Sequence, residues 1–193
     1  VAAYLPRLVE NETIEKRTAF NRSQKLNYYE ISDNLIRFWY RFIFDRQEEI
    51  ALGLGDVLFE ECKTEIDDFI AHGFEDVAIS FLTEQNGKGL LPYYYAPIRN
   101  YKVDNSKLGR SIELDGLAEG LGKNSNCLLV VECKYRKTPF SVAMLEQLKE
   151  SVSIFGGYTT IDYYLFSKSG FTPEIMKLSD SSLHFISLDS MFS

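Results

Sequence analysis

The sequence has few of the residues that bind zinc or form disulfide frameworks. Its 193 residues include only two histidines and three cysteines. His72 and His184 are too isolated in the sequence to form a zinc site. Three cysteines in a chain of this length do not make a disulfide framework. We therefore expect a protein of the reducing cytoplasm.

Long apolar runs and targeting segments are also missing. No stretch approaches the roughly 20 apolar residues of a membrane helix, and the opening residues do not resemble an export signal. Glycine-rich residues 116–124 do not make a phosphate loop, because the first glycine is misplaced and Asn124 replaces Ser or Thr. A hydrophobic content of 45% with 14% aromatic residues excludes disorder. The length suits one domain with an appendage, or two small units.

The charge of the chain is unevenly distributed. The formal net charge is −7, which argues against a protein that coats nucleic acid by bulk charge. Residues 51–98 contain two basic and nine acidic residues, whereas residues 99–137 contain eight basic and five acidic ones. Residues 99–137 are therefore able to contact the phosphates of a nucleic acid although the protein as a whole is acidic.

The first third of the chain predicts a helix, a hairpin and a second helix. Helical spacing over residues 3–9 is followed by strand-like residues 13–17, a polar turn over 21–25 and strand-like residues 26–31. This order is typical of the closing part of a winged helix over residues 1–31, with Arg22 and Lys25 at the wing tip. The alternative is an ordinary β-hairpin at a domain edge. Residues 32–52 are expected to form a connecting aromatic helix, N-capped within residues 32–34.

Residues 53–193 predict an α/β domain with a mixed sheet flanked by helices. The expected elements are, in chain order, a helix from Asp56 to Ile70, a strand within 76–82, strands over 111–118 and 128–135, a helix over 141–155, a strand over 161–167, a short helix after Pro173 and a strand over 184–188. Strands that alternate with helices at this spacing indicate an α/β core.

Four charged residues on two of these strands carry the chemistry. Side chains alternate along a strand, so Glu113 shares a face with Asp115, and Glu132 shares one with Lys134. If the strands are antiparallel neighbours, the four groups converge at one end of the sheet. Their neighbours Leu114 and Cys133 are then expected on the opposite, buried face.

Carboxylates beside one lysine suit a metal-dependent phosphodiester hydrolase. Asp115 and Glu132 are the expected ligands of Mg²⁺ or Mn²⁺, with the Cys133 carbonyl as a third and Glu113 as a further ligand or a supporting group. Lys134 is placed to orient the attacking water. The alternative is a solvated strand end. The site is favoured because Glu132 and Lys134 interrupt a run that would otherwise be buried, where unpaired charge is costly.

Longer segments carry a resemblance to known families. The segment LGRSIELDGLAEG…CLLVVECKYRKTPF resembles the PD-(D/E)XK nuclease superfamily, which has the restriction-endonuclease-like fold. Together with ISDNLIRFWYRFIF and YYLFSKSGFTPEI…HFISLDSMF, it is similar to the C-terminal region of archaeal and bacterial AAA-type ATPases, domain of unknown function family 234. The resemblance implies a P-loop ATPase module upstream in the same full-length chain, then a winged helix, then a nuclease-like domain.

The resemblance also implies further site residues. An acidic residue on the first core helix often assists metal binding in the superfamily, and Glu60 stands at the expected place. A helical wheel, however, puts Glu60 opposite the apolar face, which Glu65 borders instead. Some relatives carry a glutamine and a tyrosine four residues apart on the next helix, and this chain has Gln147 but Ser151.

Two functions follow from the sequence. The first is a Mg²⁺-dependent nuclease domain that hydrolyses DNA as the effector end of a larger ATPase. The second is an inactive nuclease-fold module that binds nucleic acid or protein and regulates the attached ATPase. The presence of Asp, Glu and Lys together at the site favours the first function. The acidic net charge of the chain and the incomplete glutamine–tyrosine element favour the second.

Overall fold

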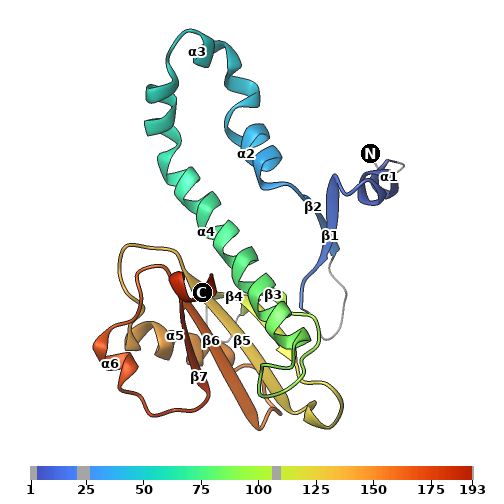
Figure 1. The fold of residues 1–193 in the computed structure, drawn as a ribbon, viewed down its shortest axis with the longest axis vertical. Helices are drawn as coiled ribbons and strands as arrows, with labels where there is room; N and C mark the ends of the chain where they lie inside the picture. Colours follow the sequence, from blue (N-terminus) through green and yellow to red (C-terminus); the bar gives the residue numbers. More distant parts are fainter. Residues whose placement is uncertain (1–3, 21–26, 106–109, 193) are drawn as a thin grey trace. The chain divides into compact units, whose positions relative to one another are not determined.

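The chain forms two compact units (Figure 1). The computed structural model describes residues 4–20, 27–105 and 110–192. The first unit comprises Val1–Thr18 and Lys25–Gly73, and the second comprises Ala19–Gln24 and Phe74–Ser193. The division falls within one helix after Gly73, whereas the sequence-based division began the nuclease-like domain at residue 53.

The first unit combines a hairpin with helices. Its elements are α1 (Leu5–Glu10), β1 (Ile14–Thr18), β2 (Asn27–Ile31), α2 (Asn34–Phe42), the 3-10 helix η1 (Phe44–Arg46), α3 (Gln47–Ala51) and the first part of α4 (Gly55–Gly87). β1 and β2 pair antiparallel, with Ile14 opposite Ile31. The predicted hairpin strands are thereby confirmed. The predicted wing tip, Arg22 and Lys25, lies outside the described residues.

The aromatic helix α2 is fixed by its cap and by ring packing. The Asp33 carboxylate accepts hydrogen bonds from the N–H groups of Leu35 at 2.8 Å and Ile36 at 2.9 Å, which confirms the predicted N-cap. The rings of Phe38 and Phe42 pack against Phe69 of α4, with centroids 5.8 and 5.7 Å apart. Phe38 and Phe42 therefore pack in the interior of the first unit.

Helix α4 is longer than the sequence predicted. It runs over 33 residues, so the strand expected within 76–82 is wrong. Phe74, Ala78 and Leu82 are buried at four-residue spacing, which is a helical period that extends the apolar face beyond Gly73. Despite its length, neither α4 nor any other helix in the described part of the chain is apolar enough to cross a membrane.

The second unit contains a five-stranded mixed sheet. The strands lie in the order β3 (Arg99–Asn105), β4 (Arg110–Glu119), β5 (Cys127–Lys134), β6 (Thr160–Ser167) and β7 (Leu183–Ser187). The first three pair antiparallel and the last three parallel, which confirms that β4 and β5 are antiparallel neighbours. The other elements are η2 (Gly122–Asn124), α5 (Val142–Val152), α6 (Pro173–Met176) and η3 (Asp189–Met191). Strand β3 was not predicted from the sequence.

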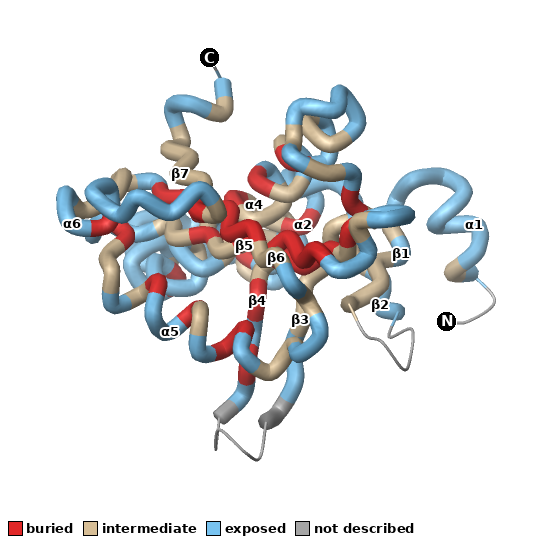
Figure 2. The backbone as a smooth tube through the Cα atoms, turned by 90° about the horizontal axis from the view of Figure 1, so that it is seen from below, coloured by how far each residue is buried: buried red, intermediate tan, exposed pale blue. Residues whose placement is uncertain are grey.

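Helices cover both faces of this sheet. On one face, Leu128 and Val130 of β5 join a buried cluster that includes Leu145 of α5 and Ile175 of α6. On the other face, the neighbouring β5 residues join a second cluster with Phe74, Ala78 and Leu82 of α4. The buried residues of Figure 2 concentrate along β4, β5 and β6. An apolar run such as that of β5 is what a strand buried on both faces requires.

A β-bulge in β4 changes the faces that simple alternation predicts. Tyr101 pairs with Leu114 but Arg99 pairs with Leu117, so β4 carries one extra residue around positions 115 and 116. Leu114 consequently lies in the cluster under α5, whereas Cys133 lies in the cluster under α4. The expectation that Leu114 and Cys133 share one face is wrong. The bulge also ends the alternation on which the shared face of Glu113 and Asp115 was based.

Candidate active site

The site begins where β4 and β5 separate. The ladder between these strands pairs Gly116 with Val131 and does not continue to Asp115. Instead, the Asp115 carboxylate takes the place of a backbone partner, because its Oδ2 accepts a hydrogen bond from the Cys133 N–H at 2.7 Å. The bulge thus aims Asp115 across the gap toward the end of β5.

Glu132 and Lys134 complete the arrangement on the face of the sheet that α5 covers. Their side chains form a hydrogen-bonded ion pair, and they are only 13% and 23% exposed. The preceding β5 residues on this face, Leu128 and Val130, are fully buried. The strand therefore carries two charged side chains directly beyond its buried apolar part, as the sequence predicted.

Burial is the largest influence on the pKa values of the two site carboxylates. Burial raises the pKa of Asp115 well above its usual value, and the charges of Glu132 and Glu75 raise it further against the opposing effects of the Cys133 N–H and Lys134. Burial also raises the pKa of Glu132, which Lys134 offsets in part. For Lys134, burial lowers the pKa, but attraction to Glu132 outweighs it and the net shift is upward. Lys134, with Arg136 in the case of Glu132, thus offsets part of the upward pKa shift of the two carboxylates.

Cys133 is not available as a nucleophile. Its side chain is 7% exposed and packs in the cluster under α4. Burial raises the pKa of the thiol well above its usual value, and the charges of Asp115, Glu75 and Glu132 add to this shift. A buried, protonated thiol is inert, so Cys133 contributes its backbone to the site.

The sequence reasoning missed Glu75, an acidic residue of α4 whose charge acts on Asp115 and Glu132. It lies on α4 in the second unit, and its charge raises the pKa values of both Asp115 and Glu132. Glu60 stands fifteen residues earlier on this helix, is 65% exposed and pairs with Lys63 at 3.1 Å. Glu65, which borders the apolar face on the helical wheel, is also exposed. The signal for Glu75 was present, because it adjoins the helical apolar positions Phe74 and Ala78.

A polar cavity of about 520 Å³ adjoins Glu132 and Lys134. Its walls include Arg136 after β5, Gln147 of α5 and Glu113 of β4. Glu113 is 64% exposed and pairs with Lys102 at 2.9 Å, and it is not among the groups that shift the pKa of Asp115. Glu113 therefore lies at the rim of the cavity rather than beside the Asp115 carboxylate.

The donor set suits a hard divalent cation held by few protein ligands. Within residues 4–20, 27–105 and 110–192, no three side chains of His, Cys, Asp or Glu gather closely enough to hold a metal ion by themselves. Mg²⁺ commonly binds through one or two carboxylates and keeps waters and substrate phosphate as its other ligands. Asp115 and Glu132, two carboxylates whose pKa values are raised chiefly by burial, fit that requirement.

Comparison with known sequences places the chain in a family. The family described as archaeal and bacterial proteins of unknown function, DUF234, matches residues 39–150. The chain belongs to the DUF234 family. The matched region of this DUF234 chain includes Glu75, Asp115, Glu132 and Lys134. No solved structure matches the chain significantly.

One curated protein is also similar to the chain. An uncharacterized protein of Methanocaldococcus jannaschii is 35% identical to this DUF234 chain over 136 residues. The aligned region covers 69% of this chain but 28% of the relative. The chain therefore spans less than a third of the length of this relative.

Proposed function

We propose that this chain is a nuclease domain of the PD-(D/E)XK type that hydrolyses DNA phosphodiester bonds with Mg²⁺ or Mn²⁺. The observation that carries the proposal is the junction of Asp115 with the end of β5, where Glu132 and Lys134 form an ion pair beside a polar cavity. Under this proposal the mixed sheet has the restriction-endonuclease-like arrangement, and residues 1–31 are the end of a winged helix.

Each residue of the site has a role that follows from its position. Asp115 and Glu132 would hold the metal ion, with the Cys133 carbonyl as a further oxygen donor. The ion, when bound, stabilises negative charge on the scissile phosphate and lowers the pKa of a bound water. Lys134 keeps its proton, because attraction to Glu132 raises its pKa, and it acts as a fixed positive charge that orients the attacking water.

Arg136 supports the same function from the wall of the cavity. Its side chain is exposed and lines the cavity beside Lys134. A guanidinium matches the geometry of a phosphate and stays charged at every physiological pH. Arg136 would therefore bind a phosphate of the strand next to the scissile one.

A second function, binding without cleavage, is favoured by one observation. The described residues supply two carboxylates at Asp115 and Glu132 rather than a group of three or more ligands. Under this function the domain would bind nucleic acid or protein and regulate an ATPase module elsewhere in the full-length chain. The same experiment distinguishes the two functions.

That experiment measures cleavage of single- and double-stranded DNA with Mg²⁺, with Mn²⁺ and with EDTA. The parent is compared with Asp115→Ala and Lys134→Ala, and with Lys137→Ala as a control for an exposed lysine on the same segment. We expect metal-dependent cleavage by the parent and by Lys137→Ala only. If the full-length protein leaves DNA intact both with Mg²⁺ and with Mn²⁺, the nuclease function is overturned and binding without cleavage is favoured.

A further inference from the structure

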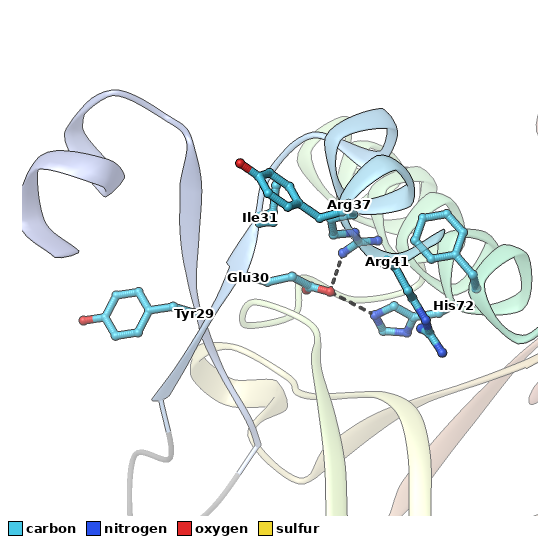
Figure 3. Close-up of a pocket in the computed structure, with 8 residues that line it drawn as sticks. Tyr29, Glu30, Ile31, Arg37, Arg41 and His72 are labelled. Carbon is cyan, nitrogen blue, oxygen red and sulfur yellow. Dashed lines mark ion pairs between the residues drawn. The ribbon is translucent and has the colours of Figure 1, made fainter. Parts of the chain in front are cut away.

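A second cavity lies within the first unit, apart from the residues of the nuclease site. Its volume is about 460 Å³, within the range of roughly 300–1,000 Å³ that is typical of small-ligand sites. It is lined by Glu30 of β2, by Arg37, Tyr40 and Arg41 of α2, and by Phe69 and His72 of α4 (Figure 3). Charged and aromatic side chains thus share one small space.

The negative charge of this cavity is compensated internally. The Glu30 carboxylate forms an ion pair with Arg37, whose side chain is 9% exposed, and a second with Nε of Arg17 at 3.0 Å. The His72 imidazole lies 3.5 Å from the same carboxylate, as the dashed lines to His72 and Arg37 in Figure 3 show. Glu30 is therefore bound to the unit's own cations.

Arg41 supplies a positive charge that no carboxylate of the unit balances. Its guanidinium packs over the Phe42 ring, 5.3 Å from the centroid, and forms no ion pair with any residue in the described ranges. In Figure 3 the Arg41 side chain extends toward His72 at the cavity. An anionic group would bind here, because the guanidinium fork matches a phosphate or a carboxylate.

Tyr40 gives this anion site an aromatic face. The ring is 52% exposed and lines the cavity. Contacts with Trp39 and Phe44, at centroid distances of 4.9 and 5.2 Å, hold the ring in place. A fixed, exposed ring beside an unpaired guanidinium suits a ligand that carries both a phosphate and a planar base. A phosphorylated peptide would use the guanidinium but has no need of the ring.

We propose that this cavity binds one nucleotide of single-stranded DNA, with the phosphate on Arg41 and the base stacked on Tyr40. The inference rests on the proposed function, because it takes the DNA substrate from it. Bases within a duplex stack on each other and are not free to lie on a side chain, so the cavity selects unpaired DNA. The Glu30–Arg37 ion pair fixes β2 against α2 and so shapes the cavity.

The test is fluorescence anisotropy with a labelled oligothymidylate of about 20 nucleotides, long enough to span several stacking sites, in EDTA so that no cleavage occurs. Arg41→Ala should weaken binding about tenfold and reduce the slope of log K against log salt by about one. Tyr40→Ala should weaken it about tenfold, whereas Tyr40→Phe keeps the aromatic face and should retain parental affinity. Lys63→Ala, an exposed lysine outside the cavity, is the matched control and should bind as the parent does.

The outcomes separate this inference from the nuclease proposal. Circular dichroism first confirms that Arg41→Ala and Tyr40→Ala are folded. If both variants then bind single-stranded DNA with parental affinity, the proposed nucleotide site is overturned. The proposed site is also overturned if the protein binds duplex and single-stranded DNA with equal affinity and Tyr40→Ala does not change that affinity. Loss of binding in the two variants together with an absence of cleavage under any metal would support the cavity and reject the nuclease. Metal-dependent cleavage by the parent, together with parental binding affinity in both variants, would support the nuclease and reject the nucleotide site in the cavity.

Discussion

The N–H of Cys133 donates a hydrogen bond to Oδ2 of Asp115 at 2.7 Å, across the point where β4 and β5 separate. This bond joins a carboxylate from a bulged strand to the backbone between Glu132 and Lys134. It holds Asp115 in place although burial, and then the negative charge of Glu132, raise the pKa of Asp115 and so disfavour its ionised form.

Asp115→Asn should separate the structural role of this residue from its chemical role. The amide oxygen still accepts the Cys133 N–H, so the variant should fold, and in EDTA at pH 7 it should melt no lower than the parent because a buried, unfavourable charge is removed. Mg²⁺ at about a hundred times its dissociation constant should stabilise the parent by about 2.7 kcal/mol and leave the variant unchanged. Thermal denaturation with and without Mg²⁺ measures both effects. Glu113→Gln is the control, and an undiminished Mg²⁺ shift in Asp115→Asn would contradict the metal site.

Lys134→Ala should slow cleavage strongly without abolishing metal binding. Loss of a fixed positive charge at the reacting group should lower the cleavage rate about 10²- to 10³-fold. Mg²⁺ binding should persist or tighten, because the positive charge that competes for Glu132 is gone. Single-turnover cleavage and calorimetric Mg²⁺ titration provide the two readouts, with Lys137→Ala as the matched control. A variant that loses both together would show Lys134 to be structural.

Glu75→Gln and Glu60→Gln form a matched pair on helix α4. The Glu75 charge acts on both Asp115 and Glu132, so its removal should weaken Mg²⁺ affinity about tenfold, as is typical of groups that support metal ligands. Glu60 is exposed and pairs with Lys63, so its substitution should leave the affinity unchanged. Calorimetric titration of the two variants decides between them. The opposite ranking would restore the assignment made from the sequence.

Tyr95→Phe should destabilise the second unit in a pH-dependent way. The buried Tyr95 hydroxyl donates to Oδ2 of Asp162 at 2.7 Å, and its loss leaves a buried carboxylate without this donor, at a cost of about 1–3 kcal/mol near pH 8. Burial, followed by the bond to Asp162, raises the pKa of Tyr95 above its usual value. The unfolded tyrosine ionises near pH 10 while the folded one keeps its proton, so this stabilisation is complete below pH 10 and falls above it by about 1.4 kcal/mol per pH unit.

Urea denaturation of the parent and Tyr95→Phe between pH 8 and pH 11 measures this dependence. The difference in unfolding free energy should narrow above pH 10. Tyr94→Phe, which alters a ring that is 60% exposed, should match the parent throughout. A difference that stays constant to pH 11 would mean that Tyr95 ionises equally in both states.

The sequence by itself determined most elements and predicted the three central residues of the candidate site. Alternation and apolar runs located β4, β5 and β6, and the charges that interrupt the run in β5 identified Glu132 and Lys134. Asp33 was recognisable as an N-cap because capping depends on residues three apart at most. These features are local, and spacing along the chain reports local structure faithfully.

Only the tertiary structure decided how the site is assembled. The bulge that aims Asp115 at Cys133 depends on the register between β3 and β4, which the sequence of one strand does not encode. Glu75 joined the site only when α4 proved continuous past Gly73 and packed on the sheet through Phe74 and Ala78. The pairing of Glu30 with Arg37, which leaves Arg41 unbalanced, likewise joins a strand to a helix. Such long-range contacts are set by packing and electrostatics between distant segments, and they decided which charges meet.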